Sequence, residues 1–417
     1  MKEIKRDLYL NRLIDRRENG AIKVITGIRR CGKSYLLFHL YKDYLLSDGV
    51  DENCIVEIPL DDDDFEEYRN KKRLSQYIKE KTIGQKTYYV FLDEVQFCEG
   101  FESVLNGLAR KENLDIYVTG SNSKFLSSDI LTEFRGRGDE VRVYPLSFSE
   151  YVSAFDGDKN DAWREYMMYG GLPRILSCKT DEQKSKYLSD LFQNVYIKDV
   201  IERNHLHDDN ILDDIVNVLA SCVGSLTNVS KLTNTFVSNG IKTNDKTIAS
   251  YIGHLADAFL IEKVNRYNIK GRKYIGSSQK YYYTDVGLRN ARLNFRQHEP
   301  THIMENIIYN ELVIRGYNVD VGVVEKYYKN EDGKQKTAQL EIDFVCNIGS
   351  NRYYIQSAYS LPDDEKFKQE TASLDRIDDS FKKVIIVADN VKPWHSDKGY
   401  LIINILDFLM NQNSLEQ

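Results

Sequence analysis

The 417 residues are enough for about two to four domains with cores of their own. The apolar content of 41% and the charged content of 29% are typical of a soluble globular protein. A net charge of −7 excludes a wholly basic nucleic-acid binder, although local basic patches can still occur. The six scattered cysteines form no CxxC pair, so neither a disulfide framework nor a zinc knuckle is indicated. No apolar run reaches the length of ~18 residues that a membrane span needs, and the amino terminus has no signal sequence, so a cytoplasmic protein without membrane contact is expected.

The first predicted element is a buried strand, Ile22 to Ile25, that runs into the sequence GIRRCGKS and then into a helical pattern. Strand, glycine loop and helix are the context of a phosphate-binding loop. Lys33 is expected to reach the β- and γ-phosphates of ATP, and the Ser34 hydroxyl is expected to bind Mg²⁺. The predicted nucleotide-binding residues are Gly27, Ile28, Arg29, Arg30, Cys31, Gly32, Lys33, Ser34 and Tyr35.

A second strand, TYYVFLDEVQ at residues 87–96, ends in an acidic pair. Asp93 is predicted to hold the Mg²⁺, directly or through water. Glu94 then lies where it can polarise the attacking water. The alternative is an ordinary strand that ends in a charged turn. An acidic pair at about this distance is expected in P-loop hydrolases that have an additional strand in the sheet.

A third strand, LDIYVTGSNSKFLSS at residues 114–128, ends in a polar cluster, where Ser121 or Asn122 is a candidate sensor of the γ-phosphate. Arg135 and Arg137 flank a glycine in a following loop that could project towards a neighbouring subunit. An arginine supplied in trans is typically worth ~10³–10⁵ in hydrolysis rate. The alternatives are an ordinary polar strand end and two surface arginines.

The chain resembles AAA-superfamily ATPases that carry a C-terminal domain of unknown function. The segments that carry the resemblance are GIRRCGKS, FLDEVQ, TGSNSKFLSS, FRGR, YPLSFSEY and YGGLPRIL. The resemblance covers nearly the whole chain. It implies an α/β fold with a P-loop ATPase core at 1–146, a helical lid at 147–207, a winged helix at 208–297 and a restriction-endonuclease-like domain at 298–417. It supports the roles given to Lys33, Ser34, Asp93 and Glu94, and it also implies catalytic roles for Asn122, Arg135 and Arg137.

The residues in the middle of the chain are consistent with this order. Apolar residues at helical spacing mark 147–205, interrupted by GGLPR at 170–174, and further helices precede a hairpin within 261–285. The hairpin interleaves tyrosines with basic residues, namely Lys263, Arg266, Lys270, Arg272, Lys273 and Lys280. Such a wing suits contact with the phosphates and bases of DNA or RNA. The alternative is a solvated hairpin in a module that packs against protein.

The last segment has the order helix, three strands, helix, strand, which resembles the core of restriction endonucleases and Holliday-junction resolvases. In that pattern Glu305, Asp343 and Gln356 converge on a metal, and Glu341 shares a strand face with Asp343. The lysine expected two residues after Gln356 is replaced by Ala358. Lys366 or Lys368 could substitute for it. A degenerate domain kept for binding or assembly is the preferred interpretation, and retained cleavage is the alternative.

The sequence therefore predicts an enzyme that uses ATP and Mg²⁺, in which hydrolysis moves the winged-helix and nuclease-like module. Its substrate is expected to be a nucleic acid or a protein assembly. One alternative is an ATP-gated, metal-dependent nuclease. Another is a signalling-type nucleotide switch that binds a protein partner. A homo-oligomer is expected if the arginine acts in trans.

Overall fold

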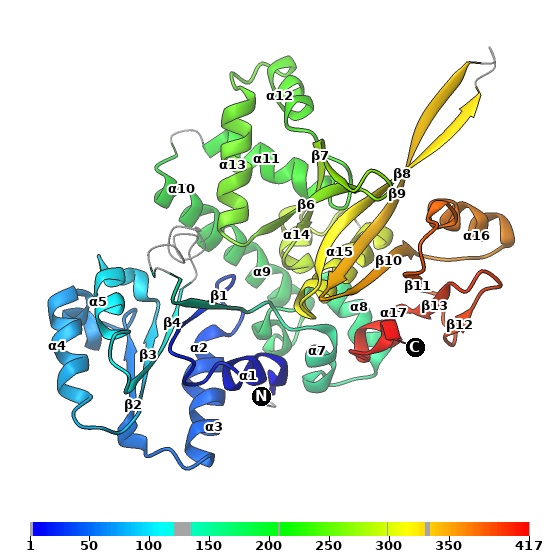
Figure 1. The fold of residues 1–417 in the computed structure, drawn as a ribbon. Helices are drawn as coiled ribbons and strands as arrows, with labels where there is room; N and C mark the ends of the chain where they lie inside the picture. Colours follow the sequence, from blue (N-terminus) through cyan, green and yellow to red (C-terminus); the bar gives the residue numbers. More distant parts are fainter. Residues whose placement is uncertain are drawn as a thin grey trace. The chain divides into compact units, whose positions relative to one another are not determined.

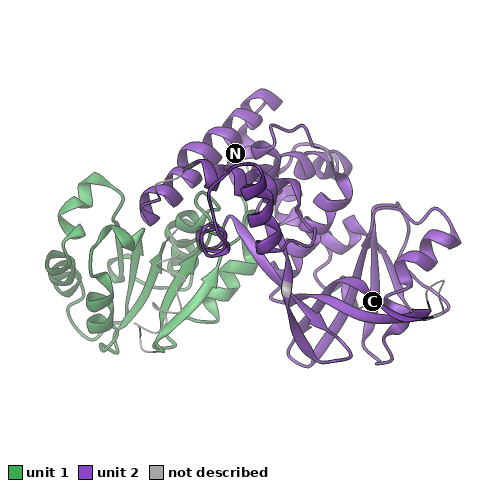
Figure 2. Cartoon of the chain, turned by 90° about the horizontal axis from the view of Figure 1, so that it is seen from above, with its two compact units in different colours: residues 1–146, 257–259 green, residues 147–256, 260–417 purple. Residues whose placement is uncertain are grey.

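The computed structural model describes residues 3–120, 134, 136–206, 209–297, 299–329 and 334–416. The chain forms two compact units, coloured separately in Figure 2. Unit 1 comprises residues 1–146 and 257–259, and unit 2 comprises residues 147–256 and 260–417. No helix in the described part of the chain is both long and apolar enough to cross a membrane.

Unit 1 is built on a parallel sheet with the strand order β2-β3-β4-β1-β5 (Figure 1). The central strands β1, β3 and β4 are almost wholly buried, because helices cover both faces of the sheet. This explains why they read as continuous apolar runs rather than as alternating patterns. The strands are β1 (Ile22–Thr26), β2 (Ile55–Pro59), β3 (Tyr88–Asp93), β4 (Leu114–Thr119) and β5 (Gly138–Arg142).

Alternate residues of these strands pack against different helices. Val90 and Leu92 face a core that includes α4 (Lys71–Lys81) and α5 (Phe101–Leu108). Phe91 between them contacts the ring of Tyr41, which lies on the helix that follows the phosphate loop. That helix comprises α2 (Lys33–Tyr35), a π-helical turn (Leu36–Tyr41) and α3 (Lys42–Ser47). α1 (Asp7–Ile14) packs beside it.

Unit 2 begins with helices, as the apolar spacing predicts. Ser147 starts α7 with a capping box in which its side chain and that of Glu150 bond each other's backbone N–H groups. The helices of this part are α7 (Phe148–Ala154), α8 (Lys159–Tyr169), α9 (Asp181–Leu191), α10 (Lys198–Asn204), α11 (Asp209–Ser221), α12 (Val229–Ser238), α13 (Asp245–Asp257) and α14 (Val286–Arg292).

The second part of unit 2 contains a mixed sheet with the order β12-β13-β11-β10-β9-β8-β6-β7. The expected order of helix, three strands, helix and strand is present from α15 (Pro300–Ile314) through β8–β10 and α16 (Asp364–Thr371) to β11. α17 (Ile405–Met410) follows the last strand. The strands are β6 (Ile261–Asn268), β7 (Lys273–Tyr283), β8 (Asn318–Lys329), β9 (Gln335–Ile348), β10 (Asn351–Ala358), β11 (Lys382–Val387), β12 (Trp394–His395) and β13 (Leu401–Asn404).

The basic hairpin expected within residues 261–285 is present as β6 and β7, and it extends this sheet. β6 pairs in parallel with β8, with Arg266 opposite Val321 and Asn268 opposite Val323. As a result the basic residues of the hairpin differ in exposure. Arg266 and Lys280 are buried in the sheet, whereas the other four, Lys263, Lys270, Arg272 and Lys273, are exposed.

A buried aspartate explains why two glycines stand side by side in GGLPR. The Asp285 carboxylate accepts hydrogen bonds from the backbone N–H of Gly171 at 2.7 Å and of Leu288 at 3.1 Å. A Cβ on Gly170 would lie 2.2 Å from the same carboxylate. Burial raises the pKa of Asp285 to about 6, although the backbone N–H donors oppose the shift. The contact joins the end of α8 to the start of α14.

We expect Asp285→Ala to lower the free energy of unfolding of unit 2 by about 2–4 kcal/mol, because buried N–H groups would lose their acceptor. Asp363 is a matched control, since it caps α16 through the N–H of Lys366 at an exposed position. Asp363→Ala should cost about 1 kcal/mol. Urea unfolding of the two variants measures both values. Equal losses of unfolding free energy in the two variants would contradict the view that burial makes the Asp285 hydrogen bonds more important than those of an exposed helix cap.

Candidate nucleotide-binding site

The loop after β1 has the backbone conformation that a phosphate-binding loop requires. Its φ angles are 138° at Gly27, 63° at Arg30 and 102° at Gly32, all in the region that favours glycine. Gly27 also has no room for a side chain, because a Cβ there would lie 2.1 Å from the carbonyl oxygen of Val143. The two glycines of the motif thus allow both the curvature of the loop and its close approach to the segment after β5.

Lys33 is buried at the start of the helix. Its ammonium donates hydrogen bonds to the carbonyl oxygens of Gly27 at 3.0 Å and Ile28 at 3.2 Å. The cation is therefore held beneath the loop whose N–H groups would surround a phosphate. Since carbonyl oxygens are weaker partners for an ammonium than phosphate oxygens, the side chain can exchange them for a ligand.

Arg6 fixes the other side of the loop. Its guanidinium donates to the carbonyl oxygens of Cys31 at 2.9 Å and of Tyr144 at 2.7 Å. Arg6 is buried, so these bonds link the phosphate loop to the chain that follows β5. Nothing near Arg6 in the sequence indicates this role, because both partners are distant in the chain.

Asp93 and Ser34 meet at the end of β3. The Asp93 carboxylate accepts a hydrogen bond from the Thr119 hydroxyl. Burial raises the pKa of Asp93, and the hydroxyls of Thr119 and, nearby, Ser34 partly oppose the rise. A serine hydroxyl beside a carboxylate is the pair of oxygen ligands predicted for Mg²⁺. These residues, with the ammonium of Lys33, have the donor chemistry that a magnesium nucleotide needs.

Glu94 has a strained backbone at the same sheet edge, with φ of 46° in the left-handed region. Its N–H donates to the Thr119 hydroxyl at 3.0 Å, and its carboxylate accepts from the amide of Gln96. Thr119 thus contacts both members of the acidic pair, and Gln96 orients the second. Neither Thr119 nor Gln96 was predicted from the sequence. The only signal was their place in FLDEVQ and at the end of the third strand.

The sheet topology brings these groups together. β4 pairs in parallel with β1 on one side and with β3 on the other. The additional strand expected from the spacing of the motifs is therefore β4, and its last residue, Thr119, reaches Asp93. Because all three strands run in the same direction, their carboxyl ends meet at one edge.

The remaining candidates of the first unit do not all fall on described residues. Ser121, Asn122 and Arg135 lie outside the described part of the chain. Arg137 is described and exposed, and its carbonyl oxygen accepts the N–H of Ile22 at 2.7 Å. Arg137 therefore lies near the amino ends of the strands, whereas the phosphate loop follows the carboxyl end of β1.

The acidic residues predicted in the last segment do come together, but around a lysine. The Lys280 ammonium lies 2.8 Å from Glu305, 2.7 Å from Glu341 and 3.7 Å from Asp343. The backbone N–H of Ser357, next to Gln356, donates to Asp343 at 2.8 Å. Among the described residues, no group of three or more histidine, cysteine or acidic side chains is arranged to hold a metal ion.

The cation near Asp343 in the structure is Lys280, rather than Lys366 or Lys368. Both residues lie on α16, where Lys366 pairs with Glu370. Ala358 packs in an apolar cluster with residues such as Ile342 and Val345. A lysine at that position would have to be buried among apolar side chains, so the cation comes from β7 instead.

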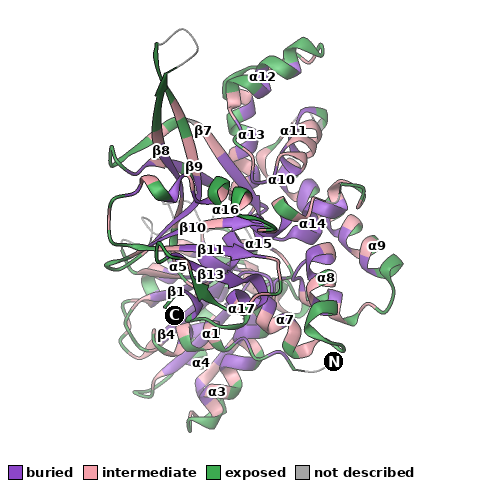
Figure 3. Cartoon of the chain, turned by 90° about the vertical axis from the view of Figure 1, so that its right-hand side faces the viewer, coloured by how far each residue is buried: buried purple, intermediate pink, exposed green. Residues whose placement is uncertain are grey.

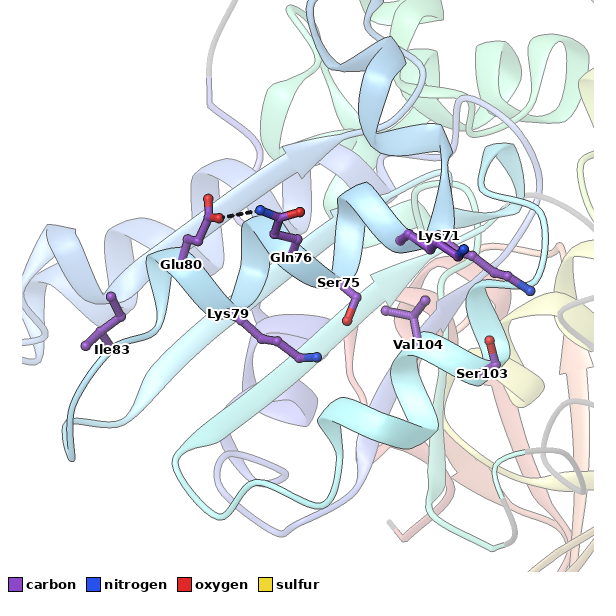
Figure 4. Close-up of a pocket in the computed structure, with 9 residues that line it drawn as sticks. Lys71, Ser75, Gln76, Lys79, Glu80, Ile83, Ser103 and Val104 are labelled. Carbon is purple, nitrogen blue, oxygen red and sulfur yellow. Dashed lines mark hydrogen bonds between the residues drawn. The ribbon is translucent and has the colours of Figure 1, made fainter.

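Unit 1 also has a surface groove away from the motifs (Figure 4). It has a volume of about 640 Å³ and lies between α4 and α5. None of the described residues that line it belongs to the phosphate loop or to the acidic pair, so it is not the nucleotide site. Its lining residues are Lys71, Lys72, Ser75, Gln76, Lys79, Glu80, Ile83, Ser103 and Val104.

Comparison with known proteins agrees with the geometry of the loop. A family model described as "AAA domain" matches residues 19–152, and one described as "Domain of unknown function (DUF8612)" matches residues 160–299. An uncharacterized protein of Haemophilus influenzae is 33% identical over 98% of this chain and 98% of its own length. The chain belongs to the family of this relative. The uncharacterized protein MJ1544 of Methanocaldococcus jannaschii is 26% identical over 97% of the chain and 88% of its own length.

Solved structures are similar to this family member at a lower level. The Aeropyrum pernix ORC1 protein, solved in complex with DNA, has a TM-score of 0.32 and 12% identity, covering 70% of this chain and 93% of its own. AMPPCP-bound DnaA from Aquifex aeolicus has a TM-score of 0.30 and 15% identity, covering 59% and 85%. The AAA domain implies nucleotide binding in unit 1.

We expect Thr119→Val to lower the rate of ATP hydrolysis by about 10- to 100-fold, because both acidic residues would lose their shared hydroxyl. ATP affinity should change little, since Lys33 and the loop are unaltered. Thr119→Ser keeps the hydroxyl and should restore most of the rate. Steady-state hydrolysis and nucleotide titration measure the two effects. A wild-type rate of hydrolysis in Thr119→Val would exclude a role of Thr119 in positioning the acidic pair.

Proposed function

We propose that the chain is a Mg²⁺-dependent ATPase whose hydrolysis is coupled to movement of unit 2. The observation that supports this most directly is the Thr119 hydroxyl, which donates to the Asp93 carboxylate and accepts the N–H of Glu94. The Ser34 hydroxyl lies near the same carboxylate. This arrangement places a hydroxyl and two carboxylates beside a loop that holds a buried ammonium.

Each residue has a separate task in this proposal. The Lys33 ammonium leaves the carbonyl oxygens of Gly27 and Ile28 and neutralises charge on the β- and γ-phosphates. Ser34 and Asp93 would hold a Mg²⁺ ion, which would supply positive charge that stabilises the phosphoryl group during transfer. The loop and the first turn of the helix orient backbone N–H groups towards the phosphates.

Glu94 is the proposed base that orients the attacking water and accepts its proton. Gln96 holds the Glu94 carboxylate, and Thr119 holds its backbone in the strained conformation. Both are positioning residues, because they act through Glu94 and Asp93. The side chain of Glu94 can be changed to an amide without altering the ligands of the metal, which allows binding and hydrolysis to be separated.

The connectivity of the chain supports coupling between hydrolysis and unit 2. The chain leaves unit 1 after Leu146, returns for residues 257–259 and leaves again at Leu260. The return lies between α13 and β6. A change in unit 1 on hydrolysis is therefore transmitted to unit 2 by covalent connections on both sides of α7–α13.

Two hairpins of unit 2 favour a phosphate-rich partner such as DNA or RNA. The hairpin of β6 and β7 exposes Lys270 and Arg272 in its turn and Lys273 and Tyr274 at the start of β7, and Tyr274 is 64% exposed. The β8–β9 hairpin projects from the rest of unit 2 (Figures 1 and 3) and exposes Lys326, Tyr327, Lys329 and Lys336. Lysine and arginine contact phosphates, and exposed tyrosines stack on unpaired bases.

The position of Arg137 bears on assembly. The residue lies at the opposite sheet edge from the phosphate loop of its own chain, so it acts on a γ-phosphate only if a second copy supplies it. The proposal therefore extends to a homo-oligomer in which Arg137 or Arg135 completes a neighbour's site.

Lys33→Ala should lose most ATP affinity, because the loop would lose its ammonium. Glu94→Gln should bind ATP with near-normal affinity and hydrolyse it about 10²–10⁴-fold more slowly, as expected when a general base is removed. Equilibrium binding of a fluorescent ATP analogue and release of inorganic phosphate measure these values. Near-normal turnover by Glu94→Gln would exclude Glu94 as the base.

Replacing Arg272 and Lys273 with alanine should weaken DNA binding and reduce the slope of log affinity against log salt by roughly 0.9 for each lost phosphate contact. Lys179→Ala with Lys186→Ala removes the same charge from exposed positions on and beside α9 and serves as the control. Fluorescence anisotropy with single- and double-stranded DNA at several salt concentrations gives the slopes. Equal slopes for the two double variants would count against the hairpin as a nucleic-acid surface.

A further inference from the structure

A buried ammonium lies at the centre of the acidic cluster of unit 2. Lys280 comes from β7, Glu305 from α15, and Glu341 and Asp343 from β9. The Lys280 side chain is only 3% exposed, and its Nζ contacts two of the carboxylates at hydrogen-bond distance. One cation thus joins three elements that are far apart in the sequence.

The surroundings fix the position of this cluster. The Tyr282 hydroxyl donates to Glu305 at 2.6 Å, and its ring stacks on Tyr309 of α15 with ring centroids 4.4 Å apart. A Cβ on Gly224 would lie 3.2 Å from the Glu305 carboxylate, so the segment after α11 covers it closely. The same segment bonds β7, since the N–H of Gly224 donates to the carbonyl oxygen of Tyr281 at 3.2 Å.

Asp343 is aimed at the cluster by an irregularity in the sheet. β8 pairs Asp320 with Val345 but Gly322 with Ile342, so two residues of β9, Asp343 and Phe344, oppose one residue of β8. A bulge of this kind turns a side chain away from the regular alternation. The Asp343 carboxylate then lies 3.7 Å from Lys280 and accepts the N–H of Ser357.

The electrostatics of the site favour an ammonium over a metal. Three carboxylates from two elements are a typical set of ligands for a divalent cation. Here Lys280 already occupies hydrogen-bond positions on two of them. The third carboxylate, Asp343, lies 3.7 Å from the same ammonium and accepts the N–H of Ser357, so all three carboxylates already have partners.

We propose that Lys280 takes the place of a divalent cation between Glu305, Glu341 and Asp343, so that the cluster is a permanent internal ion network rather than a nuclease centre. The ammonium joins β7 to α15 and β9 and fixes the basic hairpin on the C-terminal sheet. The network needs no metal to form. Removing Lys280 should create a site for a divalent cation, because the carboxylates would be left without a counter-charge.

The test uses the full-length, nucleotide-free protein and Mn²⁺ as the probe. Lys280→Ala should lower the melting temperature by about 10 °C, since it leaves buried carboxylates unpaired. Millimolar MnCl₂ should restore a large part of this loss. The recovery should disappear in the double variant Lys280→Ala with Asp343→Asn. In the wild type, any change that Mn²⁺ makes to the melting temperature should be the same with and without the Asp343→Asn substitution.

Lys23 provides a matched control in unit 1. It is also a buried lysine, and it pairs with a single carboxylate, that of Asp115. Lys23→Ala should lower the melting temperature as well, but Mn²⁺ should not restore it, because one carboxylate does not form a metal site. Recovery by Mn²⁺ in both lysine variants would mean that the effect is non-specific, which would overturn the proposal.

The wild-type protein gives a second test that does not depend on the folding of any Lys280 variant. Electron paramagnetic resonance should detect the same amount of tightly bound Mn²⁺ in the wild type and in Asp343→Asn, because Asp343 binds no metal in the wild type. With Mn²⁺ or Mg²⁺ the wild type should not cleave linear, supercoiled or branched DNA. One equivalent of Mn²⁺ lost in Asp343→Asn, or cleavage lost in that variant, would overturn the proposal and identify Lys280 as the cation of a working nuclease.

Discussion

The parallel pairing of β4 between β1 and β3 is the constraint on which the nucleotide site depends. It separates the phosphate loop from the acidic pair by one strand and places Thr119 between them. The Asp93 carboxylate then accepts from the Thr119 hydroxyl, which itself accepts the N–H of Glu94. Without the intervening strand, the three segments would not meet in this arrangement, and Glu94 would not be fixed relative to Asp93 through Thr119.

Buried cations organise both units. In unit 1 Lys23 of β1 pairs with Asp115 of β4 inside the sheet, and the Tyr117 hydroxyl donates to the same carboxylate at 2.7 Å. In unit 2 Lys280 pairs with carboxylates of α15 and β9. A buried charge is costly unless it is paired, so each pair specifies which strands or helices can lie together. Lys23 lies on the strand that leads into the phosphate loop, whereas Lys280 connects the hairpin to the rest of the C-terminal sheet.

Much of the nucleotide site could be predicted because its residues are contiguous in the sequence. The loop from Gly27 to Tyr35 and the pair Asp93 and Glu94 each follow a buried strand, so local pattern and chemistry indicate the same role. Arg6, Gln96 and Thr119 could not be assigned in this way. Arg6 and Thr119 act on partners in other segments, and the Gln96 amide could have faced any nearby acceptor.

The sequence by itself determined the phosphate loop, the acidic strand end and the order of elements in the C-terminal sheet, since periodicity and motif spacing are local properties. Only the tertiary structure decided which cation accompanies Glu305, Glu341 and Asp343. Ala358 stands where a lysine was expected, and it packs among apolar side chains. Parallel pairing of β6 with β8 brings in the neighbouring strand β7, and with it Lys280. Strand pairing across such a distance depends on the whole sheet, so no local pattern around Lys280 could distinguish a surface lysine from a buried counter-ion.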